Sequence, residues 1–269
     1  MVNLIFFSHL NTAVAEIKQI NIKSEAAVVL DSETGALLFA KNPEERLYPA
    51  SLTKIATAIY AIEKGDLDDI VTISGNAANQ KGTRVYLKKG EKIPLKILIQ
   101  GMLIHSGNDA AMAVAEHLDG NVKRFANNLN NYLINSIGVN NTHFTNPNGL
   151  FDPTHYTTAM DLAIITNYAI KNPVFSEIFG TKKFIWNGVS WKTTLFTRHL
   201  MLKGEIPYPG ITGGKTGFVE ESKSTLATTA DNGKIKLTAI ALKAANKKII
   251  YKDTEKLLDY CFNNTMRIR

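Results

Sequence analysis

Cysteine is almost absent from this sequence, since Cys261 is the single one among 269 residues. One cysteine excludes an internal disulfide and any zinc site built on cysteine pairs. The six histidines show neither the His-x-x-x-His nor the His-Glu-x-x-His spacing with which a helix presents zinc ligands. We therefore expect no metal site and no cofactor.

Long apolar runs are also missing, because no stretch after the first residues is long enough to cross a bilayer. The start of the chain is apolar over residues 2–7, and Ala13-Val14-Ala15 matches the Ala-x-Ala pattern of a signal cleavage site. The basic leader of a secretory signal is lacking. Residues 1–15 are therefore either a remnant signal peptide, which we favour, or an N-terminal helix. A signal would imply an exported, extracytoplasmic protein that is cell-wall associated or secreted.

Acidic residues are outnumbered: 24 Asp and Glu stand against 31 Lys and Arg, which gives a net charge of +7 and a pI near 9.3. The lysines are spread along the chain rather than clustered, which argues against a nucleic-acid partner. An anionic surface such as a bacterial cell wall is a possible partner, but of the interpretations of this charge we favour a protein that is merely basic. With 45% hydrophobic residues the chain can bury a sizeable core, as one large domain or as two lobes.

Strand-type segments lie at both ends of the chain, and helix-type segments lie between them. Residues 26–30 and 36–40 flank a run of turn formers, and residues 224–230 and 234–242 flank Asp-Asn-Gly, so each pair predicts a hairpin. Apolar spacing predicts helices over residues 55–62, 94–104, 110–118, 121–137, 158–170 and 251–262.

These elements predict an α/β protein: an antiparallel sheet built from both chain ends, flanked by helices, with a mostly helical lobe inserted at about residues 65–175. Asn108 or Asp109 is expected to cap the helix that begins near residue 110. The segment 181–209 is expected to be irregular, and its two tryptophans and Arg198 to pack between the lobes rather than to take part in chemistry.

The stretch Pro49-Ala-Ser-Leu-Thr-Lys54 precedes a strongly apolar helix and carries the first candidate for chemistry. Pro49 favours an extended chain just before the helix, so Ser51 falls near the helix start and Lys54 lies one turn further on the same face. A neutral lysine there can deprotonate the serine, and unpaired backbone N–H groups can stabilise an oxyanion. By itself the pattern fits a capping serine and a surface lysine as well.

Two further motifs follow, each combining a hydroxyl with an amide or an amine, so that the full set in chain order is Ser51-x-x-Lys54, Ser106-x-Asn108 and Lys215-Thr216-Gly217. The expected structure places the first at a helix start, the second on a loop between two helices and the third on a strand. This triple set is typical of penicillin-binding proteins and related β-lactamases.

The sequence resembles the low-molecular-mass D-alanyl-D-alanine carboxypeptidases among the penicillin-binding proteins. The resemblance runs from about residue 26 to 262 and includes residues 49–54, 103–111, 144–150, 155–162, 214–218 and 255–258. It implies a serine β-lactamase/transpeptidase-like fold, with residues 16–269 as a single catalytic domain. It also implies removal of the terminal D-alanine from peptidoglycan stem peptides ending in D-Ala-D-Ala, through an acyl-enzyme that β-lactam antibiotics such as penicillins also form.

Chemistry and the resemblance together assign a role to each motif residue. Ser51 is the expected nucleophile and Lys54 the base, whose pKa would be lowered by burial and by a second cation, Lys215. Ser106 is expected to relay a proton to the leaving amine. The expected substrate-binding residues are Asn108, Lys215, Thr216, Gly217 and Phe218, and the resemblance implies an oxyanion hole formed by the N–H groups of Ser51 and Phe218.

The chain departs from the family pattern in two places. Residues 221–224 read Glu-Ser-Lys-Ser where the family usually has a small Ala-Gly segment. Residues 246–251 lack the arginine that often helps to bind the terminal carboxylate, and Lys248 is the expected substitute. Because the chain stops at Arg269, we expect neither the C-terminal β-domain nor the membrane anchor helix of many relatives.

Other interpretations remain open at this stage. A class A β-lactamase shares the motifs but needs a glutamate-activated water, and residues 146–149 offer no carboxylate. A wall-binding protein without activity would fit the departures, and a transpeptidase or an endopeptidase would use the same acyl-enzyme. His105 lies next to Ser106, but neighbours in sequence point apart, so we expect a packed histidine rather than a Ser–His pair.

Overall fold

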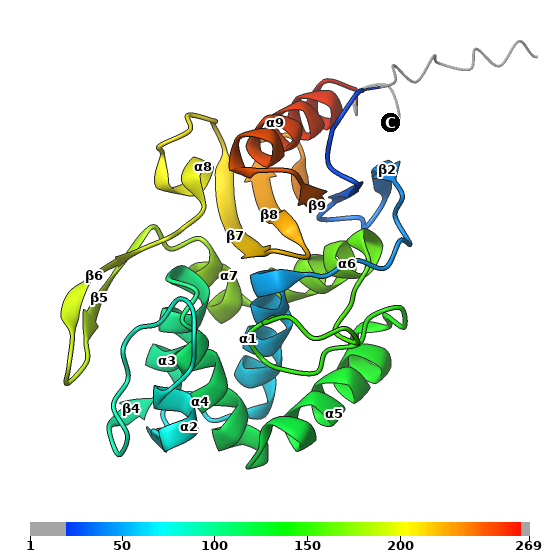
Figure 1. The fold of residues 1–269 in the computed structure, drawn as a ribbon. Helices are drawn as coiled ribbons and strands as arrows, with labels where there is room; N and C mark the ends of the chain where they lie inside the picture. Colours follow the sequence, from blue (N-terminus) through cyan, green and yellow to red (C-terminus); the bar gives the residue numbers. More distant parts are fainter. Residues whose placement is uncertain (1–19, 265–269) are drawn as a thin grey trace, which may run out of the picture.

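The structure is a computed structural model that describes residues 20–264, so the expected signal remnant at residues 1–15 lies outside the described part. A five-stranded antiparallel sheet contains strands from both ends of the chain, as predicted (Figure 1). Its order is β2-β1-β9-β8-β7, which leaves β7 at one edge. The strands are β1 (Ala26–Asp31), β2 (Leu37–Lys41), β7 (Ile211–Val219), β8 (Lys223–Asp231) and β9 (Lys236–Ala244).

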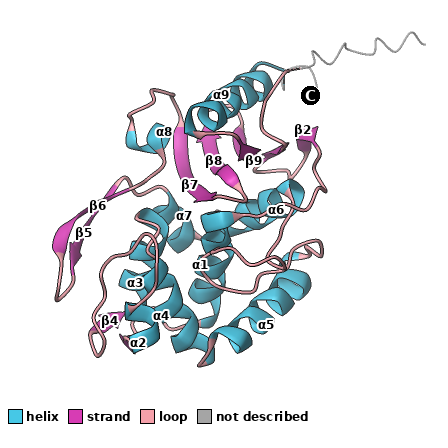
Figure 2. Cartoon of the chain, in the orientation of Figure 1, coloured by secondary structure: helices cyan, strands magenta, loops and turns pink. Residues whose placement is uncertain are grey.

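Both faces of the sheet are buried, which explains why β1 is buried along its whole length. Because side chains alternate along a strand, Ala26, Val28 and Leu30 join the core on the side of the central helices. Ala27 and Val29 face the opposite way and pack in the core that contains the C-terminal helix. Figure 2 shows the resulting layers, with helix α9 on one side of the sheet and the main group of helices on the other.

Most of the helices lie between β2 and β7 in the chain and surround α1, which contacts α3, α4, α5, α6 and α7. The helical elements are η1 (Ala50–Leu52), α1 (Thr53–Lys64), α2 (Gly75–Ala78), α3 (Leu95–Ile104), α4 (Asn108–Asp119), α5 (Val122–Tyr132), η2 (Leu133–Ile137), α6 (Ala159–Ala169), α7 (Pro173–Phe179), α8 (Leu200–Lys203) and α9 (Lys247–Asn264). These bounds confirm the helices predicted from apolar spacing. No helix within residues 20–264 combines the length and the apolar character needed to cross a membrane.

One segment differs from its expected structure. Residues 181–209 are not irregular, because they form a hairpin of β5 (Lys183–Asn187) and β6 (Lys192–Phe196), followed by α8. The hairpin projects from the body of the molecule (Figure 1). Its inner face carries Trp186 and Leu195, both buried in the main core. Trp186 therefore anchors the hairpin rather than packing between two lobes.

The start of α4 also differs from its prediction. Gly107 is the N-cap residue, and neither Asn108 nor Asp109 caps the helix, because both lie in its first turn. Asp109 is fully buried and instead accepts hydrogen bonds from the backbone N–H groups of Val85 and Leu87. This carboxylate holds the loop between α2 and the short strand β4 (Lys92–Pro94), which pairs with β3 (Ile70–Thr72). The predicted cap at Thr158 on α6 is confirmed.

Candidate active site

Ser51 lies on η1, the short 3-10 turn that leads into α1. The preceding residue, Ala50, has φ of +49°, a left-handed conformation that costs energy for any residue with a Cβ atom. Gly149 packs against this turn so closely that a Cβ on it would lie 1.8 Å from the Ala50 carbonyl oxygen. The turn that carries Ser51 is therefore held in place by a neighbour that has to be glycine.

Lys54 is completely buried one turn after Ser51. Its Nζ lies 3.1 Å from Ser51 Oγ, which confirms that the two side chains share one face of the helix start. The same Nζ donates to Asn108 Oδ1 at 2.8 Å and to the Asn148 carbonyl oxygen at 2.7 Å. These contacts fix the amine against the serine hydroxyl, the arrangement that an activated nucleophile needs.

The environment of Lys54 favours its neutral form. Burial, and after it the positive charge of Lys215, lower the pKa of Lys54 well below its ordinary value, although the carboxylate of Asp109 opposes the shift. An amine with a strongly lowered pKa is uncharged in a larger fraction of molecules at neutral pH and can then accept a proton. Both causes expected from the sequence, burial and the second cation, are therefore present.

Lys215 and Ser106 form the opposite side of the site. Lys215 is buried on β7, and its Nζ donates to Ser106 Oγ at 2.9 Å. Ser106 has φ of +70° on the loop between α3 and α4, so the backbone there is also strained. Burial, and then the nearby Arg198, lower the pKa of Lys215 to about 7. The second and third motifs thus meet through one hydrogen bond, although 109 positions separate them in sequence.

The edge strand β7 approaches η1 at Gly217. A Cβ atom there would lie 2.4 Å from Thr225 Oγ1 and 2.9 Å from the Ser51 backbone nitrogen. Thr225 Oγ1 donates to the Pro49 carbonyl oxygen at 3.0 Å and so ties β8 to the same turn. The glycine of the Lys-Thr-Gly motif therefore serves to bring the strand backbone next to the serine.

A cavity of about 350 Å³ opens between these elements. We call it the cleft. The side chains that line it include Ser51, Ser106 and Thr216 from the motifs, the exposed ring of Phe218, and two basic residues, Arg198 and Lys247. Lys54, Asn108 and Lys215 are not part of this lining.

The structure places Arg198, Lys247 and His105 in surroundings that bear on predictions from the sequence. Arg198 lines the cleft, so the expectation that it packs between lobes is wrong; the unpredicted hairpin and α8 place it there. Lys247, not Lys248, belongs to the cleft lining. The His105 ring packs edge-on against Trp191, with ring centroids 5.8 Å apart, as expected for a packed histidine.

The side chain of Asn108 has partners within the protein on both sides. Its Oδ1 accepts from Lys54, and its Nδ2 donates to the Lys81 carbonyl oxygen at 2.7 Å. It therefore joins the base to the loop that follows α2. A direct contact of Asn108 with the substrate amide stays a prediction.

Sequence reasoning missed two contributors to the site. Asn148 holds Lys54 through its backbone carbonyl, which any residue type could supply, so the sequence gives no side-chain signal for it. The buried charge of Asp109 raises the pKa of Lys54. The position of Asp109 directly after the Ser-x-Asn motif was the only signal in the sequence that it lies near the site. Within residues 20–264 no group of three His, Cys, Asp or Glu side chains could hold a metal ion.

Comparisons with known proteins identify the family and the fold of the chain. A family model described as D-alanyl-D-alanine carboxypeptidase, of peptidase family S11, matches residues 12–246. The D-alanyl-D-alanine carboxypeptidase DacF of Bacillus subtilis is 33% identical over 247 residues, which cover 90% of this chain and 62% of that protein. DacA of Haemophilus influenzae is 32% identical over 263 residues, which cover 90% of this chain and 63% of that protein. The chain thus spans somewhat less than two thirds of the length of these relatives.

Solved structures show the same fold. A D-alanyl-D-alanine carboxypeptidase from Mycobacterium tuberculosis H37Rv aligns with a TM-score of 0.86 at 25% identity, covering 92% of this chain and 94% of that one. A point mutant of the Streptomyces K15 DD-transpeptidase aligns with a TM-score of 0.85 at 26% identity. The alignment covers 91% of this chain and 100% of that one. The fold is therefore the DD-transpeptidase/β-lactamase-like α/β fold predicted from the sequence. The family match over most of its length shows that the chain belongs to the D-alanyl-D-alanine carboxypeptidases, a family of serine peptidases.

Proposed function

We propose that this protein is a serine-type D-Ala-D-Ala carboxypeptidase that removes the terminal D-alanine from peptidoglycan stem peptides and is acylated by penicillins. One observation carries the proposal: the completely buried Lys54 Nζ lies 3.1 Å from Ser51 Oγ, and its pKa is lowered well below the ordinary value, chiefly by burial. An amine of this kind is suited to take the proton of a serine that attacks a carbonyl carbon.

The proposed reaction has two halves. In the first, Lys54 takes the Ser51 hydroxyl proton while Oγ attacks the carbonyl carbon of the penultimate D-alanine, and the oxyanion faces the N–H groups of Ser51 and Phe218. The C–N bond then breaks, the leaving amine receives a proton by way of Ser106, and an ester on Ser51 remains. In the second, water attacks this ester with Lys54 as base, which frees the shortened peptide and restores the serine hydroxyl.

The substrate's terminal carboxylate is proposed to bind beside β7. Thr216 lines the cleft and Lys215 lies directly behind it, so the strand offers a hydroxyl and a cation next to each other. Arg198 and Lys247 add positive charge at the cleft wall and fill the role for which Lys248 was considered. As an edge strand, β7 can also pair with an extended peptide through its backbone.

Two further parts of the proposal follow from the substrate. Peptidoglycan lies outside the cytoplasm, so we propose an exported, extracytoplasmic protein. We also propose that residues 16–269 form one catalytic domain with the helical elements inserted between β2 and β7, a division that matches the order of the elements.

Transpeptidation is a second candidate, and one observation favours it: the chain covers the whole of the Streptomyces K15 DD-transpeptidase. An acceptor amine would then replace water in the second half of the reaction. Adding an amine acceptor to the assay distinguishes the two, because a transpeptidase forms a new amide product whereas a carboxypeptidase forms only the shortened peptide.

The test uses the Ser51→Ala variant and two assays. We expect the wild-type protein to release D-alanine from a peptide ending in D-Ala-D-Ala and to gain the mass of a penicillin in a lasting adduct. Ser51→Ala should lose both properties, whereas Ser176→Ala, which changes an exposed serine on α7, should keep both. An adduct that survives Ser51→Ala would refute the assignment of the nucleophile. Rapid turnover of penicillin would indicate a β-lactamase, and no adduct in the wild type would indicate a protein without activity.

A further inference from the structure

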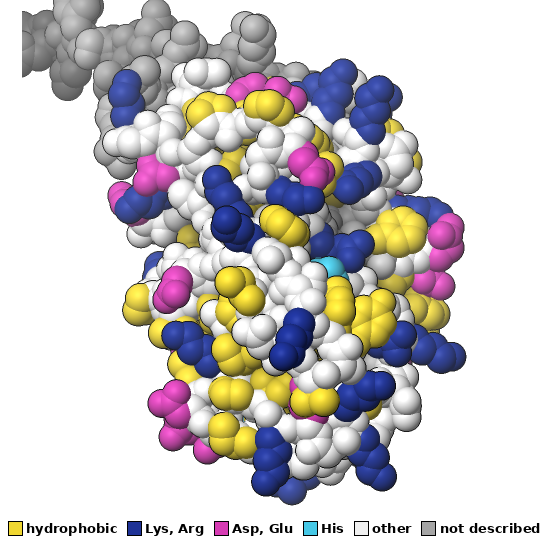
Figure 3. Space-filling model, turned by 90° about the vertical axis from the view of Figure 1, so that its left-hand side faces the viewer, with side chains coloured by type: hydrophobic (Ala, Val, Ile, Leu, Met, Phe, Trp, Pro, Cys, Tyr) yellow, Lys and Arg dark blue, Asp and Glu magenta, His cyan; other side chains and the backbone are white. Residues whose placement is uncertain are grey.

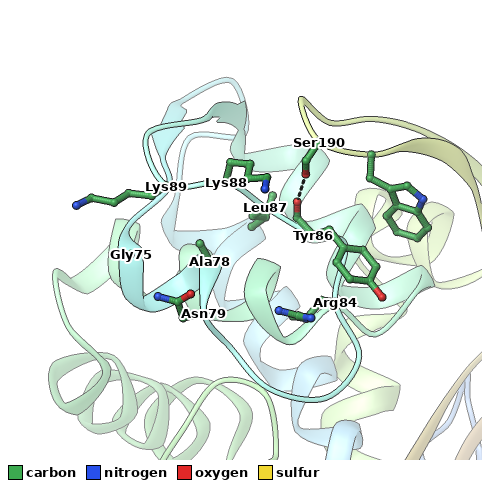
Figure 4. Close-up of a pocket in the computed structure, with 10 residues that line it drawn as sticks. Gly75, Ala78, Asn79, Arg84, Tyr86, Leu87, Lys88, Lys89 and Ser190 are labelled. Atoms are coloured by element: carbon green, nitrogen blue, oxygen red, sulfur yellow. Dashed lines mark hydrogen bonds between the residues drawn. The ribbon is translucent and has the colours of Figure 1, made fainter.

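A second cavity, of about 740 Å³, lies between the loop that follows α2 and the turn of the β5–β6 hairpin (Figure 4). We call it the basic pocket. Its lining includes Asn79, Arg84, Tyr86, Lys88, Ser190 and Trp191. None of these residues belongs to the three motifs, and the proposed reaction uses none of them.

The walls of the basic pocket are held by hydrogen bonds to the backbone. The buried Asp109 carboxylate accepts from the N–H groups of Val85 and Leu87, on either side of Tyr86. Ser190 Oγ donates to the Tyr86 carbonyl oxygen at 2.5 Å and so joins the hairpin turn to the loop. Glu91 accepts from the N–H groups of Lys88 and Val189, at 2.9 and 2.7 Å. These hydrogen bonds hold the backbone of the pocket walls in place without a ligand.

The charge inside this pocket is positive. Arg84 and Lys88 extend toward the cavity, and Lys89, which also lines it, extends away from Arg84 (Figure 4). The carboxylates of Asp109 and Glu91 lie at these walls and accept hydrogen bonds from backbone N–H groups. Among the described residues, neither Arg84 nor Lys88 forms an ion pair with a carboxylate. On the face of the molecule that carries the hairpin, acidic side chains gather mainly near the margins, while Lys and Arg spread across it (Figure 3).

Aromatic rings fix the direction of Arg84. Its guanidinium carbon lies 5.0 Å from the centroid of the Tyr86 ring, and the Tyr86 ring packs edge-on against Trp191 with centroids 4.9 Å apart. A guanidinium held over a ring still has N–H donors free to face a ligand, and a planar carboxylate can accept two of them. Tyr86 has φ of +61° and is 50% exposed, so strained backbone places its ring at the pocket rim.

The linings of the basic pocket and of the cleft come next to each other in two places. Thr83 lines the cleft, and the next residue, Arg84, lines the basic pocket. Trp191 lines the basic pocket and also a third hollow, whose other walls include Arg198 and Lys247 from the cleft. This proximity is the basis for expecting that a peptide held in the cleft brings its upstream residues toward the basic pocket, since an extended peptide advances about 3.3–3.6 Å per residue.

We propose that the basic pocket binds a carboxylate that the substrate strand carries upstream of its D-Ala-D-Ala terminus, with Arg84 and Lys88 as the partners. The inference rests on the proposed function, which supplies the strand. It assigns to this chain a preference for acidic peptides that the motifs around Ser51 do not provide. A recessed site next to the cleft suits a group on the strand held there better than it suits a flat lipid surface.

The test uses pairs of peptides that end in D-Ala-D-Ala. The two members of a pair carry Glu or Gln at the same upstream position, and this position differs from one pair to the next. Glu and Gln have the same shape, so their difference reports the charge alone. We expect the wild-type protein to prefer the Glu peptide at one position by about five- to tenfold, through a lower KM, as for a partly exposed charge-assisted hydrogen bond. The preference should shrink as salt is added.

The matched variants are Arg84→Gln with Lys88→Gln, and Lys234→Gln as a control for the loss of a surface cation. Lys234 is exposed in the turn between β8 and β9, at the end of β8 away from the cleft. The double variant should reduce the Glu preference to less than about twofold, and the control should retain it. An equal preference in the double variant, or no preference in the wild type at any position, would overturn the proposal.

A binding measurement separates this inference from the proposed function. Calorimetry on Ser51→Ala gives the dissociation constants of both peptides without turnover, so a Glu preference there supports the basic pocket even if no D-alanine is released. Release of D-alanine from both peptides with equal KM values would refute the pocket and leave the proposed function intact. Binding to vesicles of anionic phospholipid that is lost in the double variant, without any peptide preference, would also overturn the proposal, in favour of a membrane surface.

Discussion

Replacing Gly149 by alanine gives the sharpest test of how the Ser51 turn is held. Gly149 has φ of +78°, and a Cβ atom on it would lie 1.8 Å from the Ala50 carbonyl oxygen. Real Cβ atoms do not approach other atoms this closely, so the two segments must separate by more than about 1 Å. The Ala50 oxygen also accepts a hydrogen bond from Thr53 Oγ1 at 2.9 Å, which ties it to the start of α1.

Either movement disturbs the contact between Ser51 and Lys54. If η1 shifts, Ser51 moves relative to Lys54, because Lys54 lies on the buried helix α1. If the turn at Gly149 shifts instead, the Asn148 carbonyl oxygen leaves its position 2.7 Å from Lys54 Nζ. A displacement of about 1 Å at a reacting group can lower a rate about 100-fold. We therefore expect the penicillin acylation rate of Gly149→Ala to fall by about two orders of magnitude.

Gly138→Ala is the matched control. Gly138 has φ of +86°, close to that of Gly149, but a Cβ on it would have no neighbour within 4 Å. Both variants therefore carry the left-handed strain of about 1–2 kcal/mol, and only Gly149→Ala adds the collision. The assay is the rate of mass gain with penicillin, measured where thermal unfolding shows each variant to be folded. Acylation of Gly149→Ala within about threefold of Gly138→Ala would refute the reasoning.

Two further predictions follow from ionisable groups. Lys54→Arg should be nearly as inactive as Lys54→Ala, because arginine stays protonated and cannot serve as the base; D-alanine release within about tenfold of the wild type would contradict this. Burial lowers the pKa of His199 to about 3, so its contribution to stability is present above pH 6.5 and is lost as the pH falls toward 3. Denaturant unfolding should show that the free energy of unfolding falls by about 2 kcal/mol between pH 7 and pH 5 because of this residue. His199→Gln should be less sensitive to pH by that amount, and an unchanged pH dependence would contradict it.

The sequence predicts most of the sheet and the helices because their signals are local. The two β-rich runs around Asp231-Asn-Gly233 are joined by residues that favour a hairpin turn, and α6 begins at the cap that Thr158 provides. The β5–β6 hairpin was missed although Phe184 and Trp186 alternate with exposed neighbours. Its strands are five residues each, and a period of two over so short a run is a weak signal beside many polar residues.

The candidate site divides in the same way. Ser51 and Lys54 are three positions apart, so helix geometry alone predicts their contact, and the structure places them 3.1 Å apart. The partners of Lys54 on other segments depend on how distant parts of the chain pack, which one sequence does not reveal. Asn148 lies 94 positions away and contributes only a carbonyl oxygen. Arg198 reaches the cleft only because of the hairpin that the sequence did not predict.

The three cations at the cleft act as a series in which each lowers the pKa of the next. Arg198 contributes to the lowered pKa of Lys215, and Lys215 contributes to the lowered pKa of Lys54. A substrate carboxylate bound at Lys215 would raise the pKa of Lys215 and keep this lysine protonated near neutral pH. The charge of Lys215 in turn disfavours protonation of Lys54. The bound carboxylate also carries a negative charge of its own, which opposes this effect at Lys54, so the lowered pKa of the proposed base rests chiefly on its burial.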